Sequence, residues 1–166
     1  MNIRQYISLV ENASNPYTKL LKHHAIGWDF DLTLFGSPAS PSFHQFINDH
    51  PEIQHYIVTF RTHGLVHQIF SDLACYDNAP PESAFSSVLN ISIKGWAEHD
   101  RAERLRMIGK LTGPPTEAEL YYWDWKGQTC KQHGLTALVD DKAEHTEDGC
   151  NKAGVEFFNT AWFIPS

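Results

Sequence analysis

Short, nearly apolar stretches recur along the chain, with helix-like or turn-like segments between them. This alternation is typical of a sheet covered by helices on both faces. Strands that lack polar positions are expected to be parallel and buried on both faces. With 166 residues, 42% of them hydrophobic, the chain has material for one sizeable core. The sequence therefore predicts a single α/β domain over residues 1–166, a three-layer α/β/α parallel sheet. The expected strands are Ala25 to Phe30, Tyr56 to Phe60, Val88 to Ile93, Leu120 to Trp123, Leu135 to Val139 and Val155 to Phe158.

The segments between these strands carry the spacing of helices. Phe43, Phe46 and Ile47 form an i, i+3, i+4 stripe that ends before a proline. The segments 65–75 and 102–111 repeat apolar residues at helical spacing, so both are expected to be crossover helices. Residues 1–24 precede the first strand and are expected to form a helical extension, which lies outside the sheet.

Two carboxylates stand at the end of the first expected strand. Asp29 and Asp31 are spaced by one residue and are followed by Thr33. In open α/β sheets ligands bind beyond the carboxyl ends of the strands, so both acids point to a site. Two such charges about 4 Å apart repel by roughly 4 kcal/mol at an effective dielectric near 20, so the pair requires a cation or a shared proton. A hard, oxygen-seeking ion such as Mg²⁺ meets that need.

Three further segments supply groups that would join this pair. The expected strand at 56–60 carries Thr59 near its end, and this hydroxyl would donate to a phosphoryl oxygen. Lys126 is interpreted as the start of a helix, and a helix N-terminus with a lysine is an anion site. The strand at 135–139 is followed by a second acidic pair, Asp140 and Asp141. Together the segments predict a ring of phosphate-binding and metal-binding groups.

The order of these motifs resembles the haloacid dehalogenase superfamily. The match consists of DxDxT at 29–33, an apolar strand ending in Thr59, then Lys126, then an apolar strand followed by Asp140 and Asp141. A DxDxT string alone is also compatible with a turn that has an Asx cap. The resemblance covers the chain from about residue 25 onward and implies a Rossmann-like sheet. Because Asp31 is an acid, it implies a small phosphatase-type member or a phosphotransferase, not a dehalogenase or an ion-pumping ATPase.

Carried over residue by residue, the resemblance implies hydrolysis of phosphomonoesters. Asp29 would attack the phosphorus and form an aspartyl phosphate. Asp31 would protonate the leaving oxygen and then deprotonate the hydrolytic water. Thr59, Lys126 and Phe30 would bind the transferring phosphoryl group.

The resemblance also implies the ligands of the Mg²⁺ ion. These are the Asp29 carboxylate, the Asp31 backbone carbonyl and Asp140, with Asp141 supporting the ion directly or through water. The ten histidines do not indicate zinc instead, because none has an HExxH or Cys/His ligand spacing.

Two assignments have alternatives. Lys126 competes with Lys131 and Lys142, and is preferred because it is expected to follow a strand directly and lies fourteen residues before the second acidic pair. Lys131 is the second choice. Arg61, two residues beyond Thr59, is either a phosphate-binding residue or an exposed loop arginine.

Charge and composition exclude several classes of protein. The formal net charge is −7 without a run of basic residues, which disfavours nucleic acid as a partner. The three cysteines form no CxxC pair, so a reducing, cytoplasmic environment is expected. The N-terminal segment lacks the continuous apolar stretch of a signal peptide or membrane span, so no membrane association is expected.

The motif spacing limits how the site is covered. Only twenty-five residues separate Thr33 from Thr59, so no large cap fits there. The segment 76–118 has room for a small cap or for an extra strand and helix. An open site suits a large or polymer-borne phosphate, or is closed by an oligomer partner. The first hypothesis for the substrate is nevertheless a small-molecule phosphate ester. A phosphate on a nucleic-acid end or on a protein, and a homo-oligomer that closes the site, are the alternatives. A non-catalytic binding module would be favoured by loss of Asp29 or Asp31, and both are present.

Overall fold

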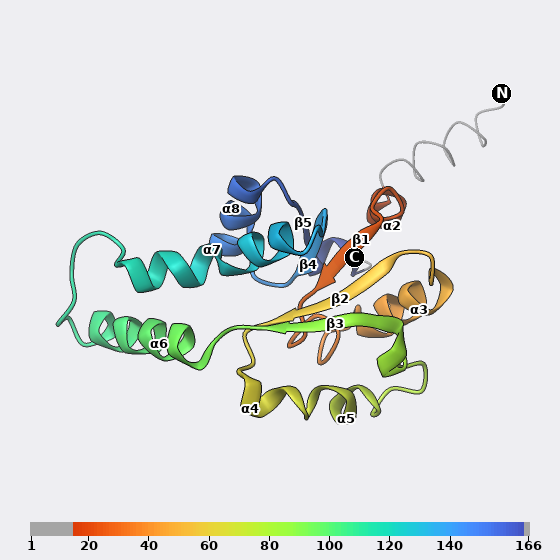
Figure 1. The fold of residues 1–166 in the computed structure, drawn as a ribbon, viewed down its shortest axis with the longest axis horizontal. Coiled ribbons are helices and arrows are strands. Elements are labelled where there is room, and N and C mark those ends of the chain that lie inside the picture. The colour runs from red at the N-terminus through yellow and green to blue at the C-terminus, as the bar shows by residue number, and fades with distance from the viewer. Residues whose placement is uncertain (1–14, 165–166) are drawn as a thin grey trace.

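A computed structural model describes residues 15–164, which form one parallel sheet with helices on both faces (Figure 1). Every strand pairing in the sheet is parallel. The α/β class and the parallel sheet predicted from the sequence are therefore confirmed, and the arrangement is consistent with a three-layer, Rossmann-like fold. The strands are β1 (Ala25–Trp28), β2 (Gln54–Thr59), β3 (Phe85–Asn90), β4 (Ala137–Asp140) and β5 (Glu156–Asn159), in the order β3-β2-β1-β4-β5.

Helices connect and cover the strands. The bounds are α2 (Pro16–Leu20), α3 (Ser40–Asp49), α4 (His63–Val66), α5 (Ile69–Leu73), α6 (Ile93–Met107), α7 (Glu117–Gln132) and α8 (Glu144–Ala153), with short 3-10 helices at Glu82–Ala84 and Thr160–Phe163. Asn15 is the N-cap of α2, and Pro16 is the first residue of that helix. The remainder of the expected N-terminal extension, residues 1–14, lies outside the described residues.

Alternating side chains of the strands fill two cores, one on each face of the sheet. Ile26 and Trp28 of β1 belong to the core under α3 and α5, whereas Ala25 of the same strand belongs to the core under α7 and α8. On β2, Ile57 belongs to the core under α3 and α5, and Val58 belongs to the core under α7 and α8. β1 and β4 are thus buried on both faces along their whole length, which is the reason that they are recognisable in the sequence.

The order of the strands sets the position of a site. The chain builds β2 and β3 on one side of β1, then crosses to the other side for β4 and β5. Between β1 and β4 the connections therefore leave in opposite directions, and in open α/β sheets ligands bind at such a point, beyond the carboxyl ends of the strands. Asp29 directly follows β1, and Asp140 ends β4.

α6 and the first half of α7 form a helical hairpin that extends beyond the sheet (Figure 1). The hairpin is held at its far end by Glu119, which is buried and accepts hydrogen bonds from the Arg106 guanidinium and from the Thr116 backbone N–H at 2.7 Å. Thr116 and Glu119 also form a capping box that starts α7. At the other end, Gly95 allows the ring of Tyr121 to pack against α6, because a Cβ there would lie 2.5 Å from the ring.

The structure corrects two expectations about α7. The strand expected at 120–123 is wrong, because these residues lie in the first half of this helix. Lys126 does not begin a helix either, but lies in the middle of α7. The aromatic run has strand propensity, but the capping box and the packing of one helix face against α8 outweigh it.

Two of the expected helices also differ in extent. The segment 65–75 contains two short helices, α4 and α5, in place of one. α6 spans Ile93–Met107, so it starts earlier than the expected 102–111. Segment 76–118 thus contains an extra strand, β3, and an extra helix, α6.

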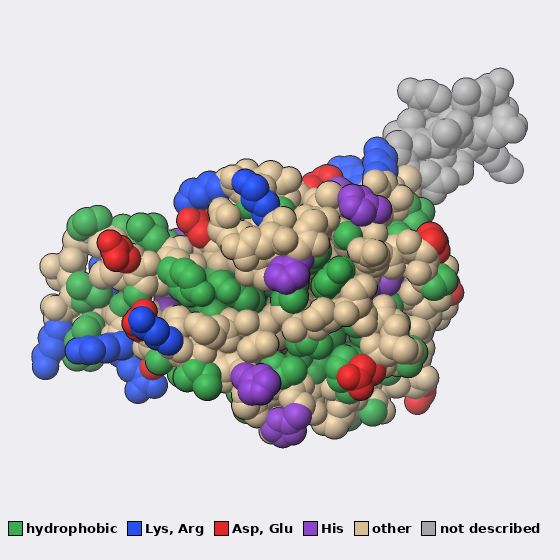
Figure 2. All heavy atoms as spheres, viewed as in Figure 1, with side chains coloured by type: hydrophobic (Ala, Val, Ile, Leu, Met, Phe, Trp, Pro, Cys, Tyr) green, Lys and Arg blue, Asp and Glu red, His purple; other side chains and the backbone are tan. Residues whose placement is uncertain are grey.

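The surface over α6 carries charges of both signs (Figure 2). Arg104 pairs with Asp100 at 2.8 Å, and Lys94 pairs with Glu98 at 3.8 Å, each one helical turn apart. Within residues 15–164, no helix is long and apolar enough to cross a lipid bilayer.

Candidate active site

Three carboxylates converge where β1 and β4 end. Asp29, Asp140 and Asp141 each offer an oxygen, and these oxygens lie within 4.8 Å of one another. Asp29 and Asp140 are buried, and the backbone N–H of Asp29 donates to Val139 at 2.9 Å, which continues the pairing of the two strands. The switch point of the sheet therefore holds a concentrated negative charge.

Lys126 lies between two of these carboxylates. Its Nζ donates to Asp29 Oδ1 and to Asp140 Oδ2, both at 2.6 Å, and the side chain is buried. The ammonium also lies 4.5 Å from the centre of the Phe60 ring, a cation–π contact. Burial disfavours the charged ammonium, but Asp140 and Asp29 outweigh this effect and raise the pKa of Lys126. The lysine is thus a fixed cation at the site.

One ammonium cannot neutralise three carboxylates. Burial, followed by the charges of Asp140 and Asp141, raises the pKa of Asp29 to about 8, although Lys126 opposes the shift. Burial and Asp140 also raise the pKa of Asp141. The arrangement fits a hard divalent cation, because it offers oxygen ligands and more negative charge than Lys126 balances. Asp29, Asp140 and Asp141 are the residues that could hold Mg²⁺.

Asp31 has a different environment from Asp29. Its side chain is 52% exposed and takes no part in the three-carboxylate cluster. Arg61 donates to it from Nε at 3.0 Å and from Nη2 at 2.7 Å, and donates from Nη1 to Asp72 at 2.7 Å. The guanidinium also lies 4.5 Å from the centre of the Phe30 ring. Arg61 is therefore neither free nor an exposed loop residue, but holds Asp31 in place.

Two threonines complete the floor of the site. Thr59 is buried at the end of β2, and its hydroxyl oxygen accepts from the backbone N–H of Arg61 at 3.0 Å. Its own O–H remains available as a donor. Thr33 is also buried and lies 3.4 Å from Asp29 Oδ2 and 3.2 Å from the Thr160 hydroxyl. Phe30, also expected to bind phosphate, has a buried side chain, so only its backbone could reach a ligand.

The loop that carries these acids is tightly folded. The backbone N–H groups of Thr33 and Phe35 both donate to the carbonyl of Phe30, at 3.2 and 2.9 Å. Leu32 has a φ of 61°, a left-handed conformation that costs a residue with a side chain about 1–3 kcal/mol. The strained residue directly follows Asp31 in this loop.

The sequence alone did not identify three residues that shape the site. Phe60 contacts Lys126, and Asp72 holds the far side of Arg61. Gly127 allows α7 to approach α8, since a Cβ there would lie 2.3 Å from the carbonyl oxygen of Gly149. A glycine inside a helical segment is the sequence signal for such a close approach. Phe60 and Asp72 lack such a signal.

The structure places most of the predicted site residues in two groups. Asp29, Asp140, Asp141 and Lys126 form one cluster, and Asp31 with Arg61 forms a second group at its exposed side. Lys131 is exposed on α7, and Lys142 is an exposed residue that donates through its backbone N–H to Asp140 at 2.8 Å. None of the protein-family models, curated proteins or solved structures compared with this chain matches it.

Proposed function

We propose that the protein is an Mg²⁺-dependent phosphohydrolase that cleaves phosphomonoesters through an aspartyl phosphate on Asp29. The observation that carries this proposal is the position of Lys126, whose Nζ lies 2.6 Å from both Asp29 and Asp140 at the switch point of the sheet. A buried carboxylate, a fixed cation and two more acids are the groups that phosphoryl transfer to an aspartate requires. The motif order that resembles the haloacid dehalogenase superfamily supports the same chemistry.

The chemistry uses Asp29 and Asp31 in two steps. In the first, an Asp29 oxygen attacks the phosphorus, the ester P–O bond breaks with its electrons, and Asp31 gives its proton to the leaving oxygen. In the second, water attacks the phosphorus, Asp31 accepts a proton from it, and the bond to Asp29 breaks to release inorganic phosphate. Lys126 and the Thr59 hydroxyl orient the phosphoryl oxygens. Bound Mg²⁺ would neutralise charge shared by the carboxylates and the phosphoryl group.

The different environments of the two acids support this division of roles. Asp29 is buried beside Lys126 and is suited to a nucleophile shielded from water. Asp31 is half exposed, so it can exchange protons with solvent while Arg61 fixes its position. A phosphotransferase would use the same residues, with an alcohol replacing water in the second step.

The test is hydrolysis of a generic aryl phosphate with and without Mg²⁺. The expected result is turnover that requires Mg²⁺, falls at least about a thousandfold in Asp29→Asn, and is retained in the exposed control Asp77→Asn. Wild-type turnover in Asp29→Asn would show that this aspartate is not the nucleophile. An added alcohol that takes up the phosphoryl group would identify the phosphotransferase reaction.

A further inference from the structure

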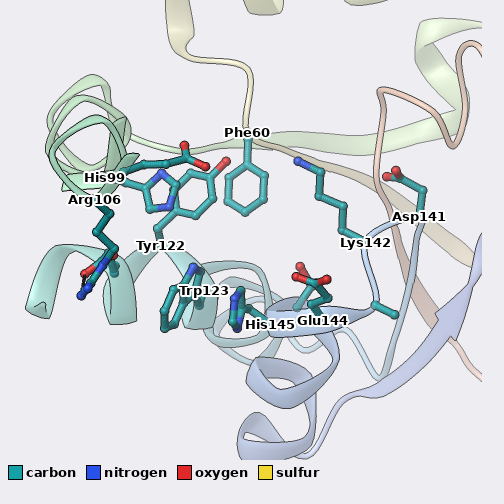
Figure 3. Close-up of a pocket in the computed structure, with 13 residues that line it drawn as sticks. Phe60, His99, Arg106, Tyr122, Trp123, Asp141, Lys142, Glu144 and His145 are labelled. Atoms are coloured by element: carbon teal, nitrogen blue, oxygen red, sulfur yellow. Dashed lines mark hydrogen bonds and ion pairs between the residues drawn. The ribbon is translucent and has the colours of Figure 1, made fainter. Parts of the chain in front are cut away.

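Phe60 lines both of two cavities beside the candidate active site. The larger cavity, of about 610 Å³, lies between the α6–α7 hairpin and the segment 141–146 (Figure 3). Its aromatic side chains already stack on one another, with ring centroids 3.7 to 4.0 Å apart. The smaller cavity, of about 260 Å³, is here called the Asp31 hollow, and it is lined by Asp31, Phe60, Arg61, Thr62, Leu65 and Trp96. The acid proposed to protonate the leaving oxygen therefore faces the smaller cavity.

The Asp31 hollow adjoins the groups that would bind the phosphoryl group. Asp31 lies two residues after Asp29, and residues 60–62 directly follow Thr59 at the end of β2. When Asp29 attacks the phosphorus, the ester oxygen leaves roughly in line with the attack and takes its proton from Asp31. The group carried by that oxygen therefore lies beside Asp31, in this hollow.

The Asp31 hollow offers no unpaired charge to a leaving group. Among the six described residues that line it, only Asp31 and Arg61 are charged, and they pair with each other at 2.7 Å. Arg61 already donates from all three of its nitrogens, since its Nη1 is held by Asp72 at 2.7 Å. A charged alcohol would therefore lose water in the hollow without gaining a partner.

Two half-exposed apolar side chains from different helices also line the hollow. Leu65 of α4 is 46% exposed, and Trp96 of α6 is 40% exposed. Neither belongs to the ring stacks of the larger cavity. The ring of Phe60, by contrast, is already in contact with Tyr122 and with the Lys126 ammonium. The apolar surface that remains open to a ligand is thus that of the two helices, and covering it with hydrocarbon is favourable.

We propose that the substrate is the phosphomonoester of a small apolar alcohol, whose hydrocarbon part lies in the Asp31 hollow against Leu65 and Trp96. The inference rests on the proposed phosphohydrolase activity and names the substrate class of that same site. The ester P–O bond breaks as Asp29 takes the phosphoryl group, and Asp31 protonates the leaving oxygen, so that the free alcohol departs. Water then releases inorganic phosphate. The volume of the hollow lies slightly below the range of sites for drug-sized ligands, so it fits a short hydrocarbon group.

The experiment compares kcat/KM for ethyl, butyl and hexyl phosphate, all with Mg²⁺. Their leaving groups are primary alcohols of similar chemistry, so the series isolates the contact of the chain with the hollow. Complete burial of one methylene corresponds to a gain of about fourfold, and a half-exposed wall to about twofold. We therefore expect kcat/KM to rise roughly tenfold from ethyl to hexyl phosphate.

Substitutions in the two walls test where the chain lies. Trp96→Ala and Leu65→Ala should each reduce the rise from ethyl to hexyl phosphate to about threefold, because each removes apolar surface from the hollow. Trp162→Ala and Leu21→Ala are the matched controls, since these side chains are 54% and 49% exposed outside the hollow, and both should keep the full rise. None of the four side chains is buried, so their replacement does not open the core.

Failure of this inference is distinct from failure of the proposed function. No Mg²⁺-dependent turnover of any ester, with an aryl phosphate included, would overturn the phosphohydrolase itself. Turnover of the aryl phosphate with equal kcat/KM across the alkyl series, or with no turnover of that series, would overturn the apolar subsite alone. A rise that is unchanged in both Trp96→Ala and Leu65→Ala would do the same. Faster hydrolysis of a phosphoserine peptide, which is also an alkyl ester, than of hexyl phosphate would overturn the assignment to a small alcohol.

Discussion

Arg61 holds the Asp31 carboxylate with two parallel hydrogen bonds, at 3.0 and 2.7 Å. A lysine cannot reproduce this planar two-point contact. We expect Arg61→Lys to lower turnover about tenfold for an alkyl phosphate but less for an aryl phosphate with a good leaving group, because only the poor leaving group depends on a well-placed acid. Steady-state kinetics on both esters measure the difference. Asp72→Asn removes the charge of the other partner of Arg61, and it should likewise lower turnover more for the alkyl phosphate than for the aryl phosphate. Equal losses of turnover on both esters would contradict a positioning role for Arg61.

The assignment of Lys126 can be tested against Lys131, which the sequence left as the second choice. Replacing it by methionine leaves Asp29 and Asp140 buried without their cation, which costs about 3–5 kcal/mol of the free energy of unfolding. Denaturant unfolding should show this loss, together with loss of turnover. Lys131→Met on the exposed face of the same helix is the matched control and should change neither. Comparable effects of both substitutions would contradict the assignment.

Mg²⁺ should stabilise the fold if the three carboxylates bind it. Binding to the folded state alone adds about 1.4 kcal/mol to the free energy of unfolding at ten times the dissociation constant. A magnesium titration followed by thermal unfolding measures this without any substrate. Asp141→Asn should weaken the effect, since it removes a ligand of the cluster, whereas Asp77→Asn should leave it unchanged. An unchanged titration in Asp141→Asn would exclude that residue from the metal site.

Gly127 tests the contact between α7 and α8. A Cβ at this position would lie 2.3 Å from the carbonyl oxygen of Gly149, so Gly127→Ala must separate the two helices. Overpacking of this kind costs about 1–3 kcal/mol of the free energy of unfolding. Because Lys126 is the preceding residue, turnover should fall as well. Gly64→Ala is the control, since a Cβ there meets no atom within 4 Å. Full activity in Gly127→Ala would show that Lys126 tolerates a shift of its helix.

Glu119 should make the stability of the α6–α7 hairpin depend on pH. Its hydrogen bonds with Arg106, followed by those with Thr116, lower its pKa from 4.5 to about 2. A carboxylate with a lowered folded-state pKa stabilises the fold above its unfolded value, and this contribution is lost as the pH falls from about 4.5 to about 2. Glu119→Gln should therefore melt at a lower temperature than the native chain at pH 7, and the gap should narrow below pH 4.5. Glu82→Gln, at an exposed position, should show no such gap.

The sequence was informative where burial leaves a repeating pattern. β1 and β4 are recognisable because both of their faces are covered, and their ends place Asp29 and Asp140 at one edge of the sheet. The two acids could therefore be assigned to one site before any contact was known.

The sequence was less informative where tertiary contacts decide the structure. The aromatic residues of α7 face α6, α8 and a cavity instead of alternating across a sheet, so their strand propensity was misleading. The Thr116 to Glu119 capping box was the available signal for a helix. Lys126 contacts both acids, as a residue of the predicted site should, but it lies in the middle of a helix and not at the helix start that the sequence predicted. Asp72 lies eleven residues from Arg61, and no spacing rule indicates their contact.

Because α7 is a single unbroken helix, the residues that line the cavity and the lysine between the two acids belong to one rigid element. Tyr122 and Trp123, which line the larger cavity, lie about one turn before Lys126. A ligand that tilts the outer end of this helix therefore also changes the position of the ammonium between Asp29 and Asp140. The position of the cavity-lining end of α7 and the position of the Lys126 ammonium are therefore not independent of each other.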